Sequence, residues 1–277
     1  MSTIKNIDLN RIIKYSFKQL VKDWKFFVFM AVVFYIVTLL SSLGDLFLSK
    51  EKLVLSVITL LVFLILYIAL YFIYEFYLYK STLKNKKSFS IRFKQLILEN
   101  KGFAGKFFLY SLLFALFFFA IFFALPGILI ALILQIFSDV VLNTTLITII
   151  VVATLVLLIK YAVSWQFYPF LLVQKIEKKQ HIKFMDLLKN SEKLVKGNWW
   201  LVFGIGILRV LIVSVFTLVG YLLVLPLSLL GLYLETGSVV LLITLITDLI
   251  LMIVYGLEIP FSILYSGELF KQLKKLK

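Results

Sequence analysis

Cysteine is absent from the 277 residues, and histidine occurs only once. Without cysteine the chain can form no disulfide, no thiolate metal site and no cysteine nucleophile. The single histidine, His181, stands in a basic loop, where a solvated side chain is more common than a catalytic base. No G-x-S-x-G or H-E-x-x-H sequence is present. The sequence therefore predicts no metal and no cofactor, and it favours a protein that is not an enzyme, with an intramembrane enzyme kept as a third alternative.

Charge is also scarce. Only 16% of the residues are charged and 62% are hydrophobic, whereas soluble domains are about 25% charged. Six apolar runs are long enough to cross about 30 Å of hydrocarbon. They lie near residues 26–43, 53–76, 107–125, 145–173, 199–225 and 239–264. The composition thus predicts an all-α integral membrane protein with six transmembrane helices.

The charge that is present is mostly positive and unevenly placed. Segments 1–25, 80–106, 174–198 and 271–277 hold 6, 8, 7 and 4 of the 29 lysines and arginines. These segments are every second loop of a six-span chain, so the positive-inside rule predicts a multi-pass cell-membrane protein with both termini in the cytoplasm. A net charge of +15 would suggest nucleic acid in a soluble protein, but this distribution argues against that partner. We expect membrane lipids instead, with anionic headgroups at the cytoplasmic face.

Three basic segments have the apolar spacing of amphipathic helices, at residues 8–24, 88–103 and 184–196. Each precedes two spans, so an even number of crossings separates the copies and the repeats are parallel. We predict one membrane domain, 1–277, made of three helical hairpins, each introduced by a cytoplasmic surface helix. The hairpin units cover residues 8–79, 88–175 and 181–270. Expected anchors at the membrane surface are Trp24, Lys196, Trp199 and Trp200.

Proline occurs four times, always in an apolar run, and in a helix interior it removes a hydrogen bond and clashes with the preceding turn. We predict helix kinks or breaks at Pro126, Pro169, Pro226 and Pro260. The apolar runs continue past Pro126 and Pro226, either as re-entrant pieces or as long tilted helices. Gly204 and Gly206 are expected at a contact between helices.

Ionisable side chains inside the spans are the candidate functional residues, because a charge at the bilayer centre costs about 2.5–3.5 kcal/mol or more. They are Lys160, Arg209, Asp248, Glu258 and Glu75. The favoured pairs are Arg209 with Glu258, then Lys160 with Asp248. Such pairs either fix the packing of helices or line a path for an ion, a proton or a lipid headgroup, and Glu75 can also snorkel toward the surface.

One local pattern resembles a known family. A span ending in Pro-Phe-Leu-Leu at residues 169–172 is followed by Phe184, Leu187, Ser191, Gly197 and Trp199. This pattern is similar to the membrane domain of glycerophosphoryl diester phosphodiesterases and to the YciC-like polytopic families, over about residues 95–265. The resemblance implies a fold more than an activity, because a separate soluble domain carries out the chemistry in those phosphodiesterases.

The leading hypothesis from the sequence is a non-enzymatic membrane protein that handles or senses lipid, or assists transport. The alternative is a structural or accessory subunit that binds a membrane complex through its basic cytoplasmic helices.

Overall fold

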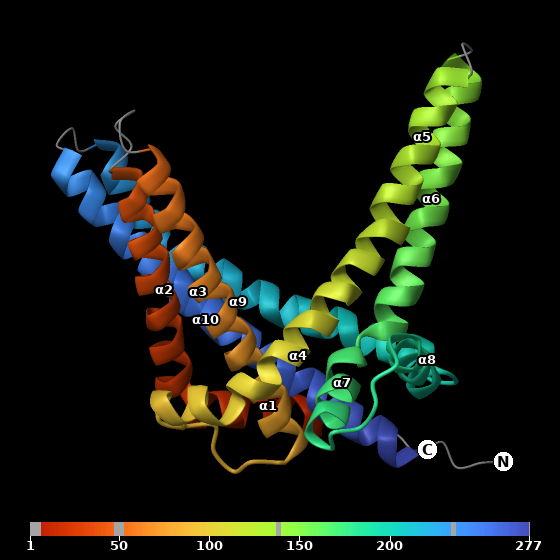
Figure 1. Ribbon diagram of the computed structural model, residues 1–277, viewed down its shortest axis with the longest axis horizontal. Coiled ribbons are helices and arrows are strands. Elements are labelled where there is room, and N and C mark those ends of the chain that lie inside the picture. The colour runs from red at the N-terminus through yellow and green to blue at the C-terminus, as the bar shows by residue number, and fades with distance from the viewer. Residues whose placement is uncertain (1–6, 47–52, 137–139, 234–236, 277) are drawn as a thin grey trace. The chain divides into compact units, whose positions relative to one another are not determined.

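A computed structural model describes residues 7–46, 53–136, 140–233 and 237–276, and every regular element in these ranges is a helix (Figure 1). The elements are α1 (Leu9–Lys22), α2 (Trp24–Leu46), α3 (Leu53–Leu83), α4 (Phe93–Phe119), the π-helical turn η2 (Ala120–Ala124), α5 (Leu125–Ile136), α6 (Val140–Trp165), α7 (Tyr168–Glu177), α8 (Phe184–Val195), α9 (Trp199–Tyr233) and α10 (Gly237–Leu276).

Five stretches of helix are long and apolar enough to cross a membrane: Val57–Leu83, Phe93–Ile136, Val140–Glu177, Trp199–Gly231 and Val239–Leu276. A sixth is added if α1 and the start of α2 count as one span, although the chain bends by 69° between them. Helices suit these segments because lipid offers the backbone no hydrogen-bond partners, so each segment must satisfy its own N–H and C=O groups. The expected all-α class is confirmed, with helices consistent with a multi-pass membrane protein.

The chain divides into two compact units. The first comprises Met1–Ala104 and Gly204–Lys277, and the second comprises Gly105–Phe203. The boundaries fall within α4 and α9, each of which contributes to both units. The predicted division of the domain into three hairpins stays a prediction.

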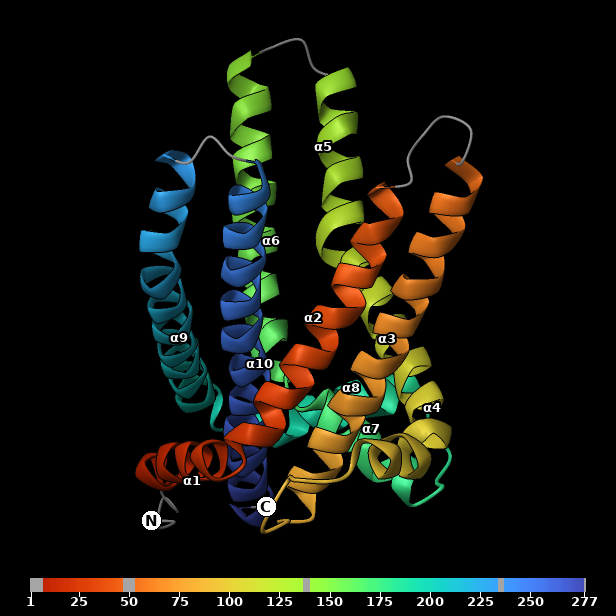
Figure 2. The same ribbon diagram turned by 90° about the vertical axis from the view of Figure 1, so that its left-hand side faces the viewer.

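In the first unit, α10 packs against α1, α2 and α3, and α2 also packs against α3 (Figures 1 and 2). Helices α2 and α10 lie close together at Gly256, where an added Cβ would collide with the side chain of the buried Ala31. Gly220 similarly faces Val254 at 3.0 Å from an added Cβ. By contrast, an added Cβ at Gly204 or Gly206 meets no described atom within 4 Å, so a helix contact at these two glycines stays a prediction. At Gly256 and Gly220, small residues do admit close helices.

Helix α1 lies across the end of the first unit at which α10 terminates (Figure 2). The Asp8 side chain caps α1 by accepting a 2.9 Å hydrogen bond from the Arg11 N–H. One residue, Asp23, separates α1 from α2. Its carboxylate is buried and accepts hydrogen bonds from Ser88 Oγ at 2.6 Å and from the Phe89 N–H at 3.0 Å. Asp23 therefore fixes the bend by tying it to the loop that precedes α4.

In the second unit, α5 packs beside α6, and α8 packs against α6 and α7 (Figure 1). Helix α6 ends at Trp165 and α7 begins at Tyr168, with Pro169 in its first turn. The buried Ser191 of α8 hydrogen-bonds the backbone groups that this break leaves without helical partners. Its Oγ donates to the Ser164 C=O at 2.7 Å and accepts from the Phe167 N–H at 3.3 Å.

The other three prolines do not interrupt the helices. Pro226 and Pro260 lie inside α9 and α10, which continue through them. Pro126 is the second residue of α5 and follows the π-helical turn η2, a common form of helix irregularity. The segments beyond Pro126 and Pro226 are therefore continuous helix as far as Ile136 and Tyr233, and the predicted kinks at these three prolines stay predictions.

The segment 88–103 also differs from the expected separate surface helix. Helix α4 begins at Phe93 and runs without a break into the apolar stretch that ends at Phe119. In contrast, α8 is a helix of its own, separated from α9 by Gly197, whose φ of +90° suits glycine best.

Candidate functional site: an intramembrane arginine

Arg209 lies in α9, inside a stretch long enough to cross a membrane. Its Nη1 donates a 2.7 Å hydrogen bond to Ser266 Oγ on α10. Ser266 is buried, and the guanidinium itself is partly buried. A guanidinium has five N–H donors, so a single serine hydroxyl leaves most of its hydrogen-bonding capacity unused.

Two tyrosines lie close to this cation. The hydroxyls of Tyr79 on α3 and Tyr265 on α10 both interact electrostatically with Arg209. Tyr265 Oη also donates to the Ile205 C=O of α9 at 3.2 Å, which holds α9 against α10. Tyr79 interacts in turn with Glu75, one helical turn earlier in α3. We call Glu75, Tyr79, Arg209, Tyr265 and Ser266 the arginine cluster.

The structure does not bring Arg209 and Glu258 together. Glu258 accepts a 2.5 Å hydrogen bond from Thr217 Oγ1 on α9. Ser266, the partner of Arg209, lies eight residues further along α10, which is about 12 Å at 1.5 Å per residue. The favoured pair from the sequence is therefore wrong, because the register of α9 on α10 places each group beside a neutral hydroxyl.

No ion pair joins Arg209 or Glu258 to an oppositely charged side chain within the described part of the chain. Ion pairs found there include Arg11 with Glu268 at 2.9 Å and Lys271 with Glu268 at 3.7 Å. Glu268 is almost fully buried, and its pair with Arg11 ties α1 to the basic end of α10. Burial, and then the Glu268 carboxylate, raise the pKa of Tyr15 on α1 above its ordinary value.

The second predicted pair spans the two units. Lys160 belongs to the second unit, where it is exposed and its Nζ lies 5.3 Å from the centre of the Tyr161 ring. Asp248 belongs to the first unit, is exposed, and lies near Tyr35, whose hydroxyl donates to the Leu245 C=O at 2.6 Å. Pairing of Lys160 with Asp248 stays a prediction.

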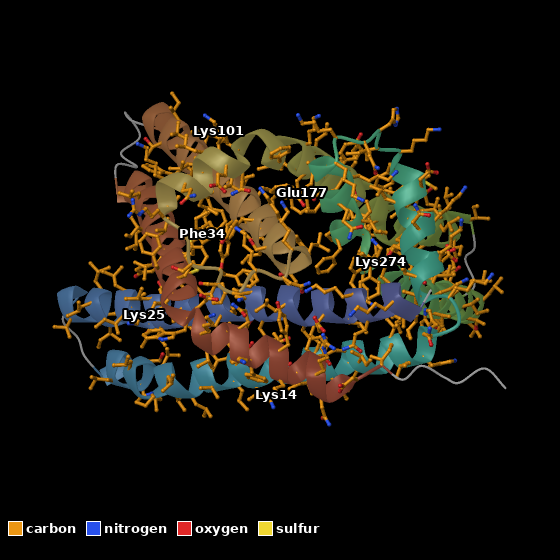
Figure 3. All side chains as sticks on the ribbon, turned by 90° about the horizontal axis from the view of Figure 1, so that it is seen from below. Lys14, Lys25, Phe34, Lys101, Glu177 and Lys274 are labelled. Carbon is orange, nitrogen blue, oxygen red and sulfur yellow. The ribbon has the colours of Figure 1, made fainter. Side chains whose placement is uncertain are left out.

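The candidate surface anchors are mostly exposed. Trp24 and Trp200 are 50% and 78% exposed, Lys196 is exposed, and Trp199 is half-buried with its ring stacked on Phe203. In the first unit, Lys14, Lys25 and Lys274 project outward from α1, α2 and α10 (Figure 3). Their exposure suits contact with water or headgroups, while the predicted position of these residues at a membrane surface stays a prediction.

Sequence reasoning missed the roles of several polar residues that the fold uses: Asp23, Tyr79, Ser191, Thr217, Ser266 and Glu268. Asp23 had a detectable signal, since it is one of two acids in the basic segment 1–25, and Glu268 is the last acid before the basic segment 271–277. The roles of the hydroxyl groups had none, because serine, threonine and tyrosine are common in apolar helices.

The described residues hold no group of three or more histidines, cysteines, aspartates or glutamates able to bind a metal ion. The chemistry that the arginine cluster offers is recognition of an anion, since a guanidinium matches carboxylate and phosphate geometry. No known family model, curated protein or solved structure matches the chain.

Proposed function

We propose that the chain is a multi-pass cell-membrane protein, with both termini in the cytoplasm, that binds the anionic group of a lipid at Arg209 without chemically altering it. One observation carries this proposal. Arg209 stands inside an apolar span, and its hydrogen-bond partner is a neutral serine in place of a carboxylate. An ionisable group at such depth is costly and usually serves a ligand or a partner.

The depth of Arg209 suits a lipid better than a soluble anion. It lies ten residues after Trp199, or about 15 Å along the helix, within reach of a headgroup drawn inward from the surface. Basic segments at the end of the first unit, including Lys14 and Lys274, favour anionic lipids by about 1 kcal/mol for each cation near the surface. In this proposal α1 and α8 lie on the cytoplasmic surface of the membrane. The six membrane crossings are α2, α3, α4 together with α5 as one crossing, α6, α9 and α10.

The test is native mass spectrometry of the protein released from nanodiscs that contain phosphatidylglycerol and phosphatidylcholine. The wild type should retain phosphatidylglycerol, and Arg209→Leu should lower that retention by about 10- to 100-fold, the effect of one or two charge-assisted hydrogen bonds. Arg209→Lys should keep part of the phosphatidylglycerol retention. Equal retention by Arg209→Leu and the wild type would refute lipid binding at this residue.

Ser266→Ala is the matched control, because it removes the other partner of the hydrogen bond and leaves the cation in place. Lipid retention should survive in Ser266→Ala. If Arg209 served only to pack α9 against α10, both substitutions would lower the melting temperature and neither would change retention selectively. A second protein present in stoichiometric amount would instead support the accessory-subunit alternative.

A further inference from the structure

A polar pocket of about 500 Å³ opens in the first unit, away from the arginine cluster. Three elements line it. Tyr77 comes from the end of α3, Gln95 and Glu99 come from the start of α4, and the loop between these helices contributes Lys86, Ser90, Ile91 and Arg92. Its volume falls within the 300–1,000 Å³ typical of small-molecule sites.

The loop that forms the pocket is held in place by buried hydrogen bonds. Tyr77 Oη donates to the Phe89 C=O at 2.7 Å, and the Phe89 N–H donates to the Asp23 carboxylate. The Lys86 N–H donates to the Ser81 C=O at 3.2 Å, after a turn in which Asn85 takes a φ of +50°. The pocket is therefore preformed, so a ligand need not order the loop when it binds.

The charges of the lining favour an anion. Lys86 Nζ lies 5.0 Å from the centre of the Tyr77 ring, which holds the ammonium beside the pocket. Arg92 is exposed, and no side-chain hydrogen bond or ion pair occupies its guanidinium within the described residues. The single acid, Glu99, already accepts a 2.7 Å hydrogen bond from Gln95 Nε2. Two cations thus face one carboxylate, which already accepts a hydrogen bond from Gln95.

We propose that this pocket binds a phosphate group, carried either by an anionic lipid headgroup or by a soluble phosphate ester. Arg92 offers a planar pair of N–H donors that matches two phosphate oxygens, and Lys86 supplies a second positive charge. Ser90 and Gln95 add neutral hydrogen-bonding groups for the rest of the ligand. This site goes beyond the proposed function, since it uses none of the residues of the arginine cluster.

The test compares two double substitutions that remove the same charge. Lys86→Gln with Arg92→Gln removes both cations of the pocket, whereas Lys94→Gln with Lys101→Gln removes two exposed lysines of α4 that do not line it. The full chain in phosphatidylcholine nanodiscs is titrated with inorganic phosphate by calorimetry. In parallel, nanodiscs containing phosphatidylglycerol are analysed for retained lipid by native mass spectrometry.

The pocket variant should weaken binding by about tenfold or more, and the control variant by less than about twofold. Loss in the calorimetric arm identifies a soluble ester. In the lipid arm, a headgroup is identified when the pocket variant loses one bound phosphatidylglycerol that Arg209→Leu retains. Equal losses in the two variants, or no binding of either probe to the wild type, would overturn the proposal.

Glu99→Gln should tighten phosphate binding, a result that misfolding cannot produce. Removing this carboxylate takes away repulsion toward a phosphate, so binding should become tighter by about two- to fivefold. Unchanged or weaker binding by Glu99→Gln would show that no phosphate lies beside Glu99, and the proposal would fail. Arg209→Leu should leave phosphate binding at the pocket unchanged, so failure of one site is distinguishable from failure of the other.

Discussion

Several wholly or partly buried polar side chains of the first unit bond to neutral groups in place of opposite charges. Arg209 bonds to Ser266, Glu258 bonds to Thr217, and Asp23 bonds to Ser88 and to a backbone N–H. A hydroxyl can donate or accept, so it suits either sign of charge. This versatility explains why matching Arg209 with Glu258 by depth along the spans failed to find their partners.

Asp23 provides the clearest test at the scale of single residues. Asp23→Ala removes the acceptor of Ser88 Oγ and of the Phe89 N–H, and each buried donor left without a partner costs about 1–3 kcal/mol. We expect a lower melting temperature in detergent, followed by circular dichroism. Asp186→Ala is the control, because Asp186 is exposed on α8. An equal effect of both substitutions would show that the Asp23 contacts add nothing to stability.

In the second unit, a break separates helix α6 from helix α7, and Ser191 of α8 supplies hydrogen bonds to the backbone at this break. Proline at position 169 lacks an N–H and clashes with the carbonyl four residues earlier, which favours a break between α6 and α7, although α9 and α10 continue through their prolines. The broken turn leaves the Ser164 C=O and the Phe167 N–H without helical partners, and Ser191 binds both. The break follows from the local sequence, whereas the group that satisfies it comes from α8.

Ser191→Ala should therefore destabilise the protein although alanine is the better helix former. Two buried backbone groups lose their partner, at about 1–3 kcal/mol each, so the melting temperature measured in detergent should fall. Lys189→Ala, an exposed substitution on the same helix, should leave it within experimental error. A melting temperature unchanged by Ser191→Ala would mean that water or a backbone shift satisfies the break.

The orientation of the whole molecule in the membrane is a prediction from the distribution of lysine and arginine. Because the chain has no cysteine, single cysteines can report it without background. A cysteine replacing Val140, at the start of α6, should react with an impermeant maleimide in intact cells. Cysteines replacing Lys189 or Lys274 should react only after permeabilisation.

The opposite labelling pattern would reverse the proposed topology, and labelling of all three positions in intact cells would contradict a sealed multi-pass arrangement. Expression of each variant without added reagent, followed by labelling in detergent, shows that every cysteine is reactive. The resemblance to the phosphodiesterase membrane domain is a separate prediction, which these experiments on topology do not address.

The sequence by itself determined the helical class, the approximate positions of the spans and the absence of cysteine chemistry. These properties depend on composition and on local periodicity, which lipid enforces through the need to satisfy every backbone group within a segment. Only the tertiary structure decided that Arg209 meets Ser266, that Gly256 meets Ala31, and that Lys86 and Arg92 share a pocket. The first two contacts depend on the register and rotation of one helix against another, which residues far apart in the chain set. The pocket depends on the fold of the loop between α3 and α4, which the distant Asp23 helps to hold.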